Sequence, residues 1–338
     1  MARIARPVRP ATRLRAIQSA RPRIPSVTPA RRHACTIRTA SATVVAIGFS
    51  QSTCLPASAA WTTCSACRAF GEHVVQAAEA GKHVLCEKPM ATTVADAVRM
   101  VQACRRAGVT LGVAFNLRQH PAYIRARELV AAGALGRIVL AQAQWAFGVR
   151  GRDGSPPRTP LTQWWDTPEL IGGASTMMGT GVHSVDLLRF VLGAEVDEIT
   201  AVTDGQTAAR PLEQLACLAL RFGNGTLGQV VASRLLPDSR NDFRVYGITG
   251  LIAGHHSMWE ARTGRFEITS DTVNETADYP EALLPNYVAE IEDFQRAVAT
   301  GAPPAATGLD GLRVVEITLA MIESARTRRS VKIERVEA

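Results

Sequence analysis

The chain has 338 residues, of which 46% are hydrophobic and 20% are charged, so it can bury a core of about two domains and is neither disordered nor fibrous. No stretch approaches the roughly 20 apolar residues that a membrane-spanning helix needs, so we expect a soluble protein. The net charge of +8 does not indicate a nucleic-acid-binding body, because residues 1–71 hold eleven Arg and no acid, which leaves 8 − 11 = −3 for residues 72–338.

Residues 1–70 form an atypical region rich in Arg, Ala, Pro, Ser and Thr, which we expect to be disordered. The apolar run Thr43–Phe49 resembles the core of an export signal, and the acid-free composition is also typical of a transit peptide. We favour a cytoplasmic protein, because a targeting segment would leave the next domain too short and residues 72–338 hold only three scattered cysteines. Cys64-Ser-Ala-Cys67 is a CxxC pair without partner ligands, so no metal site is predicted.

From Gly71 onward the chain shows the periodicities of an α/β protein. Thr93 and Asp96 resemble a capping box, and glycines end both predicted helices. The predicted elements are a helix over Glu72–Ala80, a buried strand over His83–Cys86, a helix from Thr93 to Gly108 and a strand over Leu111–Phe115. A strand, a helix and a strand in so few residues predict a parallel βαβ unit within residues 71–120.

A different pattern follows a helix predicted at about 121–132. Alternating side chains predict a strand over Val139–Trp145, and Asn224-Gly225 is a strong signal for a hairpin. The remaining predicted elements are strands over Leu215–Phe222, Thr226–Ser233 and Phe243–Gly247 and helices at about 286–299 and 308–325. We therefore expect residues 121–338 to form an α+β domain with an open, mostly antiparallel sheet, whose last helix packs back on the first part.

The triplet Glu87-Lys88-Pro89 follows the predicted strand over His83–Cys86. Open α/β sheets keep their ligand crevice at the carboxyl ends of parallel strands, so Lys88 is placed where its ammonium can stabilise negative charge on a substrate oxygen. An exposed Glu–Lys pair of little energetic value would have the same sequence.

Two polar residues follow the next strand at the same edge. Arg118 has the geometry to bind a carboxylate, a phosphate or sugar hydroxyls. The alternative is that Asn116 caps the following helix and Arg118 only solvates a loop.

The stretch Gly172–Phe190 is the most informative one. Its glycines permit close backbone approach, and a helix is predicted to begin near His183. His183 and Asp186 then share one helix face. The helix dipole disfavours a cationic His183, which suits a neutral hydrogen-bonding group or proton relay, although a histidine that merely caps its helix is the alternative.

Together these stretches resemble the Gfo/Idh/MocA family of NAD(P)-dependent oxidoreductases over about residues 71–335. The resemblance implies a Rossmann domain, incomplete here and represented by residues 71–120, followed by an α+β domain for substrate binding and oligomerisation over 121–338. By the family pattern, Lys88 is the catalytic lysine and His183 the acid/base histidine. Glu87, Lys88 and Pro89 border the cofactor, and Asn116, Arg118 and Asp186 surround the substrate.

The chain departs from the family pattern at three places. Gly179 stands where many members carry an Asp, and Trp165 stands where an Arg is frequent, so Trp165 is expected to bind substrate by stacking. Residues 1–70 hold no glycine-rich phosphate turn, since Gly48 is their only glycine, and no acid to bind the ribose. The number of residues before Lys88 is about that which the family fold requires, whereas residues 1–70 lack the family's features. This combination suggests a shifted reading frame upstream of about Phe70.

The sequence therefore predicts an oxidoreductase that transfers a hydride between NAD or NADP and a sugar, cyclitol or related polyol. Two alternatives are an NAD-recycling glycosidase or lyase and a catalytically silent binding or scaffold protein of the same fold. We expect a homo-oligomer formed through the open sheet, with no nucleic-acid or membrane partner.

Overall fold

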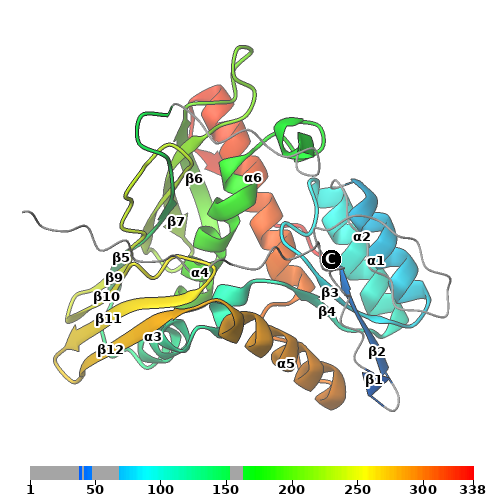
Figure 1. Ribbon diagram of the computed structural model, residues 1–338, viewed down its shortest axis with the longest axis horizontal. Helices are drawn as coiled ribbons and strands as arrows, with labels where there is room; N and C mark the ends of the chain where they lie inside the picture. The colour runs from blue at the N-terminus through cyan, green and yellow to red at the C-terminus, as the bar shows by residue number, and fades with distance from the viewer. Residues whose placement is uncertain (1–37, 40–41, 48–67, 153–162) are drawn as a thin grey trace, which may run out of the picture. The chain divides into compact units, whose positions relative to one another are not determined.

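The computed structural model describes residues 38–39, 42–47, 68–152 and 163–338, and its first sheet has four strands in the order β1-β2-β3-β4. β2 and β4 each pair with β3 in parallel, and β1 pairs with β2 antiparallel. The strands are β1 Arg38–Thr39, β2 Ala42–Ile47, β3 His83–Cys86 and β4 Leu111–Val113, with α1 Arg68–Glu79 and α2 Val94–Ala107 between the last three. The predicted parallel βαβ unit is thus confirmed (Figure 1).

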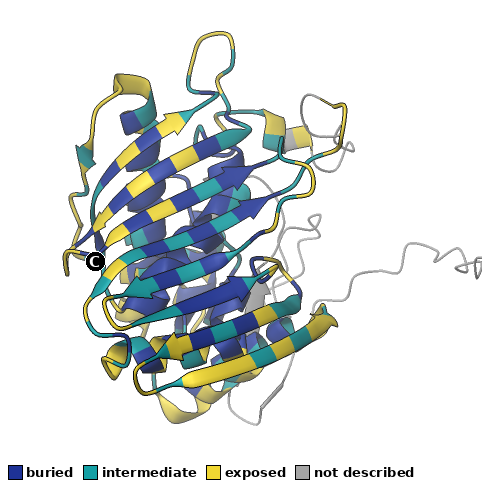
Figure 2. Cartoon of the chain, turned by 90° about the vertical axis from the view of Figure 1, so that its left-hand side faces the viewer, coloured by how far each residue is buried: buried dark blue, intermediate teal, exposed yellow. Residues whose placement is uncertain are grey.

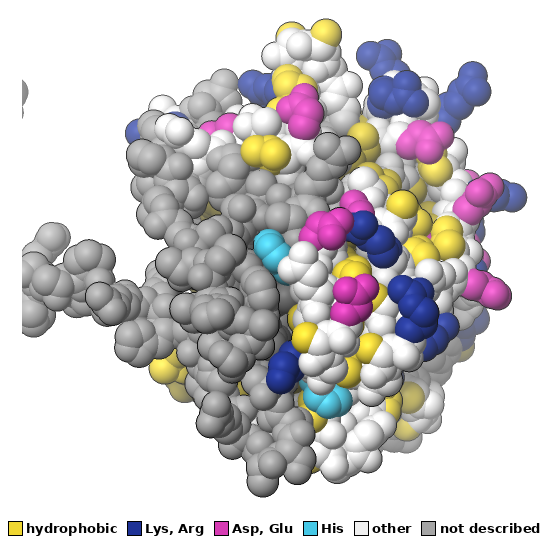
Figure 3. Space-filling view, turned by 90° about the vertical axis from the view of Figure 1, so that its right-hand side faces the viewer, with side chains coloured by type: hydrophobic (Ala, Val, Ile, Leu, Met, Phe, Trp, Pro, Cys, Tyr) yellow, Lys and Arg dark blue, Asp and Glu magenta, His cyan; other side chains and the backbone are white. Residues whose placement is uncertain are grey.

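Local signals fix the ends of α2. The Thr93 side chain accepts a hydrogen bond from the Asp96 amide at 3.1 Å, and Gly108 ends the helix with a left-handed φ of 65°. Arg99 of α2 pairs with Glu72 of α1 at 3.0 Å and with Asp96 at 3.1 Å. Figure 3 shows that basic and acidic side chains are interspersed over the side of the molecule that carries these two helices.

The second sheet has nine strands in the order β12-β11-β10-β9-β5-β8-β7-β6-β13. All neighbours pair antiparallel except β5 and β8, which are parallel. The strands are β5 Ile138–Ala146, β6 Val196–Thr203, β7 Leu215–Phe222, β8 Leu227–Ser233, β9 Phe243–Gly247, β10 Gly250–His255, β11 Arg262–Ser270, β12 Asn274–Ala282 and β13 Val331–Lys332. The Asn224-Gly225 hairpin is confirmed, and Gly225 adopts a φ of 84°.

One face of this sheet is covered and the other is open. Along β7, Ala216, Leu218, Leu220 and Phe222 are buried and alternate with exposed residues. Figure 2 shows this alternation on the open face, with the helices behind the sheet. The inner face packs against α4 Val182–Leu192 and α6 Gly308–Thr327, while α3 Pro121–Ala131 and α5 Leu284–Thr300 complete the helices of this half.

The last long helix contributes to two cores. Leu312, Val314 and Val315 of α6 pack with α2 and β4, whereas Ile317 and Met321 belong to the core under the large sheet. One helix, α6, therefore packs against both the small parallel sheet and the large sheet.

Several boundaries differ from the sequence predictions. α1 begins at Arg68, four residues before Glu72, and β4 ends at Val113, because the chain turns into the short helix η1 Asn116–Gln119. The apolar run near Thr43 contributes β2 to the parallel sheet, where Val44–Ile47 pair with His83–Cys86. Cys64-Ser-Ala-Cys67 and most of residues 1–70 lie outside the described residues. In the part of the chain that the structure describes, no helix is long and apolar enough to cross a membrane.

Candidate active site

Lys88 lies directly after β3, in a Glu87-Lys88-Pro89 turn whose Lys88–Pro89 peptide bond is cis. Its Nζ donates a 2.9 Å hydrogen bond to the carbonyl oxygen of Gly179, and its backbone N–H donates to Glu87 Oε2 at 3.2 Å. The lysine of the parallel sheet thus contacts the segment that leads into α4, 91 residues later in the chain.

Acidic groups from three elements surround Lys88. Burial lowers the pKa of Lys88 and Arg234 lowers it further, whereas the carboxylates of Glu87, Glu260 and Glu290 act to raise it. The resulting ammonium gives up its proton more readily than an exposed lysine does. This is the property expected of a group that hydrogen-bonds a reacting oxygen and exchanges a proton with it.

His183 lies in the first turn of α4, which continues from a π-helical turn over Met177–Gly181. Burial holds the pKa of His183 well below its ordinary value, and the positive charge of Lys88 lowers it further. The sequence pattern predicted that the helix dipole keeps His183 neutral. The π-helical turn that precedes α4 leaves no free helix end at His183, so burial is the main cause of its lowered pKa. His183 Nδ1 is buried and has no hydrogen-bond partner among the described residues.

Aromatic rings hold the imidazole of His183. Its centroid lies 5.0 Å from the ring of Trp145 at an interplanar angle of 31°, and 6.1 Å from Phe115 in an edge contact. Trp259 extends the wall, with its ring 5.9 Å from Trp145. Sequence analysis missed both tryptophans, because Trp145 had the pattern of a core strand residue. The one available signal was its place near the carboxyl end of β5.

Buried polar atoms without partners in the described part of the chain also occur on η1 and α5, which pack against each other. Asn116 Nδ2 donates to the Glu260 carbonyl at 3.1 Å, but its buried Oδ1 has no partner within the described ranges. Asn286 Nδ2 and Glu290 Oε1, one turn apart on α5, are also buried and unpaired there. Burial raises the pKa of Glu290 well above its ordinary value, and Glu87 raises it further. Buried polar atoms without partners are costly, and they are typical of sites that bind a ligand.

Arg118 and Asp186 lie in a separate cluster and pair with each other. Arg118 Nε and Nη2 donate to the two Asp186 oxygens at 2.8 and 2.6 Å, and both side chains are almost fully buried. Arg118 also donates to Asp310 at 2.9 Å and to the Ala305 carbonyl at 2.6 Å. Arg118 and Asp186, which were predicted to contact substrate, are thus already hydrogen-bonded to protein groups. This pairing favours a structural role for both residues.

Trp165 lies in the short helix η2 Gln163–Asp166, half-buried against the core under the large sheet. Its contact with a substrate stays a prediction. In the described ranges no group of three or more His, Cys, Asp or Glu could hold a metal ion.

The residues present fit the nicotinamide half of a dinucleotide. Lys88 stands at the carboxyl end of the parallel strand β3, and Asn116, whose buried Oδ1 has no partner in the described ranges, follows the neighbouring parallel strand β4. The sequence holds no glycine-rich turn before β3, and residues 48–67 lie outside the described part, so no residue is assigned to the pyrophosphate.

Two family models match the chain. The model described as "Oxidoreductase family, NAD-binding Rossmann fold" matches residues 54–115, and the "GFO/IDH/MocA C-terminal domain" matches residues 123–253. The first match begins at residue 54, within the region that sequence reasoning set apart as foreign to the family.

Individual relatives agree with these models. The chain is 30% identical to 1,5-anhydro-D-fructose reductase of Ensifer adhaerens over 264 residues, covering 78% of this chain and 76% of the relative. It is 29% identical to myo-inositol 2-dehydrogenase of Thermotoga maritima, covering 81% and 79%. The solved structure of levoglucosan dehydrogenase in complex with NADH and L-sorbose has a TM-score of 0.69 and 25% identity, covering 81% of this chain and 79% of that one.

Proposed function

Since this chain belongs to the Gfo/Idh/MocA family of oxidoreductases, we propose that it transfers a hydride between NAD or NADP and a sugar, cyclitol or related polyol. The relatives named above are a reductase and dehydrogenases of this substrate class. The observation that supports the proposal best is the approach of Lys88 to Gly179, which brings an ammonium next to the segment that carries a neutral, buried His183.

We assign separate tasks to these two side chains. Lys88 hydrogen-bonds the reacting oxygen of the substrate and stabilises its developing negative charge, and His183 accepts or returns the hydroxyl proton. Glu87, Lys88 and Pro89 border the nicotinamide, which when bound supplies the hydride acceptor or donor. Because Gly179 offers only its carbonyl, the proton relay runs through His183, a water or a substrate hydroxyl.

The test is Lys88→Ala, assayed over sugars and inositols with both cofactors. We expect turnover to fall by about 10²–10⁴-fold, since an acid–base group is removed, with a much smaller change in cofactor binding. Lys332→Ala is the control, because it also removes a lysine but lies in β13, the last strand in the order of the large sheet, whereas Lys88 follows β3 of the small sheet. Unchanged turnover of Lys88→Ala would remove Lys88 from its role.

Two other functions are separated by the same assay. A cofactor-recycling glycosidase or lyase cleaves a bond without net release of NAD(P)H, so absorbance of the reduced cofactor distinguishes it from a dehydrogenase. A silent scaffold protein shows no turnover with any substrate, and the absence of a glycine-rich turn within residues 1–70 is the feature that favours it.

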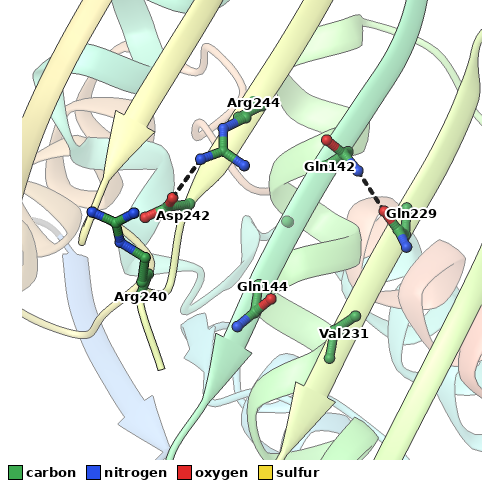
Figure 4. Close-up of a pocket in the computed structure, with 8 residues that line it drawn as sticks. Gln142, Gln144, Gln229, Val231, Arg240, Asp242 and Arg244 are labelled. Atoms are coloured by element: carbon green, nitrogen blue, oxygen red, sulfur yellow. Dashed lines mark hydrogen bonds and ion pairs between the residues drawn. The ribbon is translucent and has the colours of Figure 1, made fainter. Parts of the chain in front are cut away.

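We also propose that the open face of the large sheet joins copies of the chain. It carries a pocket of about 350 Å³, a Gln142–Gln229 hydrogen bond and an Arg244–Asp242 ion pair of 2.7 Å (Figure 4). Val202 of β6 is 71% exposed on this sheet. Light scattering is expected to give a multiple of 36.2 kDa for the wild type and a smaller mass for Val202→Asp, and a monomeric wild type would contradict the proposal.

Two further assignments complete the proposal. Residues 71–120 form the cofactor part, which is an incomplete Rossmann domain, and residues 121–338 form the substrate and oligomerisation part. The protein is cytoplasmic, which is supported by the free thiols of Cys86, Cys104 and Cys217. Fractionation of expressing cells tests the location, and recovery outside the cytoplasm would contradict it.

A further inference from the structure

Glu213 is a fully buried carboxylate in the loop between β6 and β7. Its Oε1 accepts the backbone N–H of Met177 at 2.9 Å, and its Oε2 accepts that of Ser175 at 3.1 Å. Gln206 Nε2 donates to the same Oε2 at 2.8 Å. Burying a charge is costly unless hydrogen bonds compensate it, and here three donors converge on one carboxylate.

The loop that carries Glu213 is itself held under strain. Gln206 adopts a φ of 54°, which side-chain-bearing residues rarely do, and it bonds both Glu213 and the Gly173 carbonyl, at 3.2 Å. A Cβ on Gly205 would lie 2.4 Å from the Glu213 nitrogen, so only glycine fits there. The carboxylate is therefore held firmly against the amides that it accepts.

Those amides begin the π-helical turn. Val182 N–H bonds the Met177 carbonyl, five residues back, which defines the turn over Met177–Gly181. Gly179 lies in its middle, and its carbonyl accepts the hydrogen bond from Lys88. Since Gly179 has no side chain, only the course of its backbone determines what Lys88 meets.

We propose that Glu213 is a positioning residue for Lys88: by anchoring the amides of Ser175 and Met177, it fixes the π-turn that aims the Gly179 carbonyl at Lys88 Nζ. Glu213 acts through the backbone and touches neither Lys88 nor His183. The inference takes the functional importance of Lys88 from the proposed function. Its physical content, the hold on the lysine, can be measured without turnover.

The chain has only three lysines, Lys82, Lys88 and Lys332, so their titrations can be resolved. Reductive ¹³C-methylation of the cofactor-free protein, followed by NMR, reports each one. A carbonyl acceptor favours the charged lysine, so we expect Glu213→Gln to lower the titration midpoint of Lys88 by about 0.5–1 pH unit and to leave the other two unchanged. The charged and titratable groups that face Lys88 remain in place in this variant; they are Glu87, Glu260, Glu290, Arg234 and the neutral His183.

Asp204→Asn is the matched control. Asp204 accepts the amides of Gln214 and Leu215 in the same loop, at 2.7 and 2.8 Å, so its loss disturbs the loop without removing an acceptor from the π-turn. If Glu213 only stabilises the fold, both variants lower the melting temperature and neither moves the Lys88 titration. That result, or equal Lys88 midpoints in Glu213→Gln and wild type, overturns the proposal.

A second variant guards against misfolding of Glu213→Gln. Gln206→Ala removes one donor from the carboxylate and is expected to shift the Lys88 midpoint in the same direction by a smaller amount; no shift in a folded Gln206→Ala counts against the proposal. If Lys88→Ala keeps full turnover, the proposed function fails, while the Lys88 midpoint in Glu213→Gln still decides the role of Glu213. The two failures are therefore distinguishable.

Discussion

Two buried polar clusters share the elements η1 and α4, and they differ in how far their groups are paired. In the paired cluster of Arg118, Asp186, Arg189 and Asp310, every charged side chain has an oppositely charged partner. In the open cluster of Lys88, Asn116, His183, Asn286 and Glu290, buried nitrogen and oxygen atoms remain without partners in the described part of the chain.

The difference separates residues that share a motif. Asn116 and Arg118 are two positions apart in η1, and His183 and Asp186 are three apart in α4, yet each pair divides between the two clusters. A paired charge already has its hydrogen bonds and stabilises the fold, whereas an unpaired buried group gains them from a ligand. The paired cluster therefore supports η1 and α4, the two elements that also carry Asn116 and His183 of the open cluster.

His183 offers the largest expected effect on function. His183→Gln is expected to lower turnover by about 10²–10⁴-fold, because a proton-transfer group is lost, while the melting temperature changes little. Steady-state kinetics and thermal unfolding measure the two quantities. His73→Gln on α1 is the control, and a His183 variant as active as that control would refute the division into two clusters.

Arg118 offers the largest expected effect on stability. Arg118→Met leaves Asp186 buried without its main partner, so we expect a loss of about 3–5 kcal/mol in the free energy of unfolding. Denaturant unfolding measures it. Arg125→Met is the matched control, because Arg125 makes a similar two-point pair with Glu275 but is about half exposed, so its removal is expected to destabilise the protein much less than Arg118→Met does. Equal losses would contradict the comparison.

The sequence predicted the elements whose signals are local. The strand over His83–Cys86, the cap at Thr93 and the Asn224-Gly225 hairpin depend on neighbours in the chain, and each was found where predicted. The parallel pairing of β5 with β8 was not predicted, because it joins strands more than 80 residues apart and no local pattern encodes it.

The site was less predictable for the same reason. The resemblance singled out Lys88 and His183, but the ring of Trp145 beside His183 and the carboxylate of Glu213 beneath the π-turn come from distant strands and loops. Arg118 and Asp186 had the residue types of ligand-binding groups. Their mutual pairing depends on the tertiary fold, because η1 and α4 are distant in the sequence.

The pH dependence of stability tests the paired cluster at Asp310. Burial alone would raise its pKa, but the charges of Arg118 and Arg189 hold it at about 2. A carboxyl whose pKa is lower in the folded state stabilises the protein at pH values above its unfolded-state pKa, which is about 3.9 for Asp. This stabilisation is lost as the pH falls toward 2. Wild type should therefore exceed Asp310→Asn by about 2 kcal/mol at pH 6, and the gap should narrow below pH 4. A gap that is constant over that range in denaturant titrations contradicts the assignment.

Glu290 in the open cluster should show the opposite sign, with the smallest effect. Its pKa is raised in the folded state, first by burial and then by Glu87, so its ionisation opposes folding as the pH rises above the ordinary value. Glu290→Gln is thus expected to be more stable than wild type at pH 8, with the advantage shrinking toward pH 4. Thermal unfolding across this range measures it. A variant that is less stable at pH 8 would show that the Glu290 carboxylate is already satisfied without a ligand, and would place it with the paired cluster.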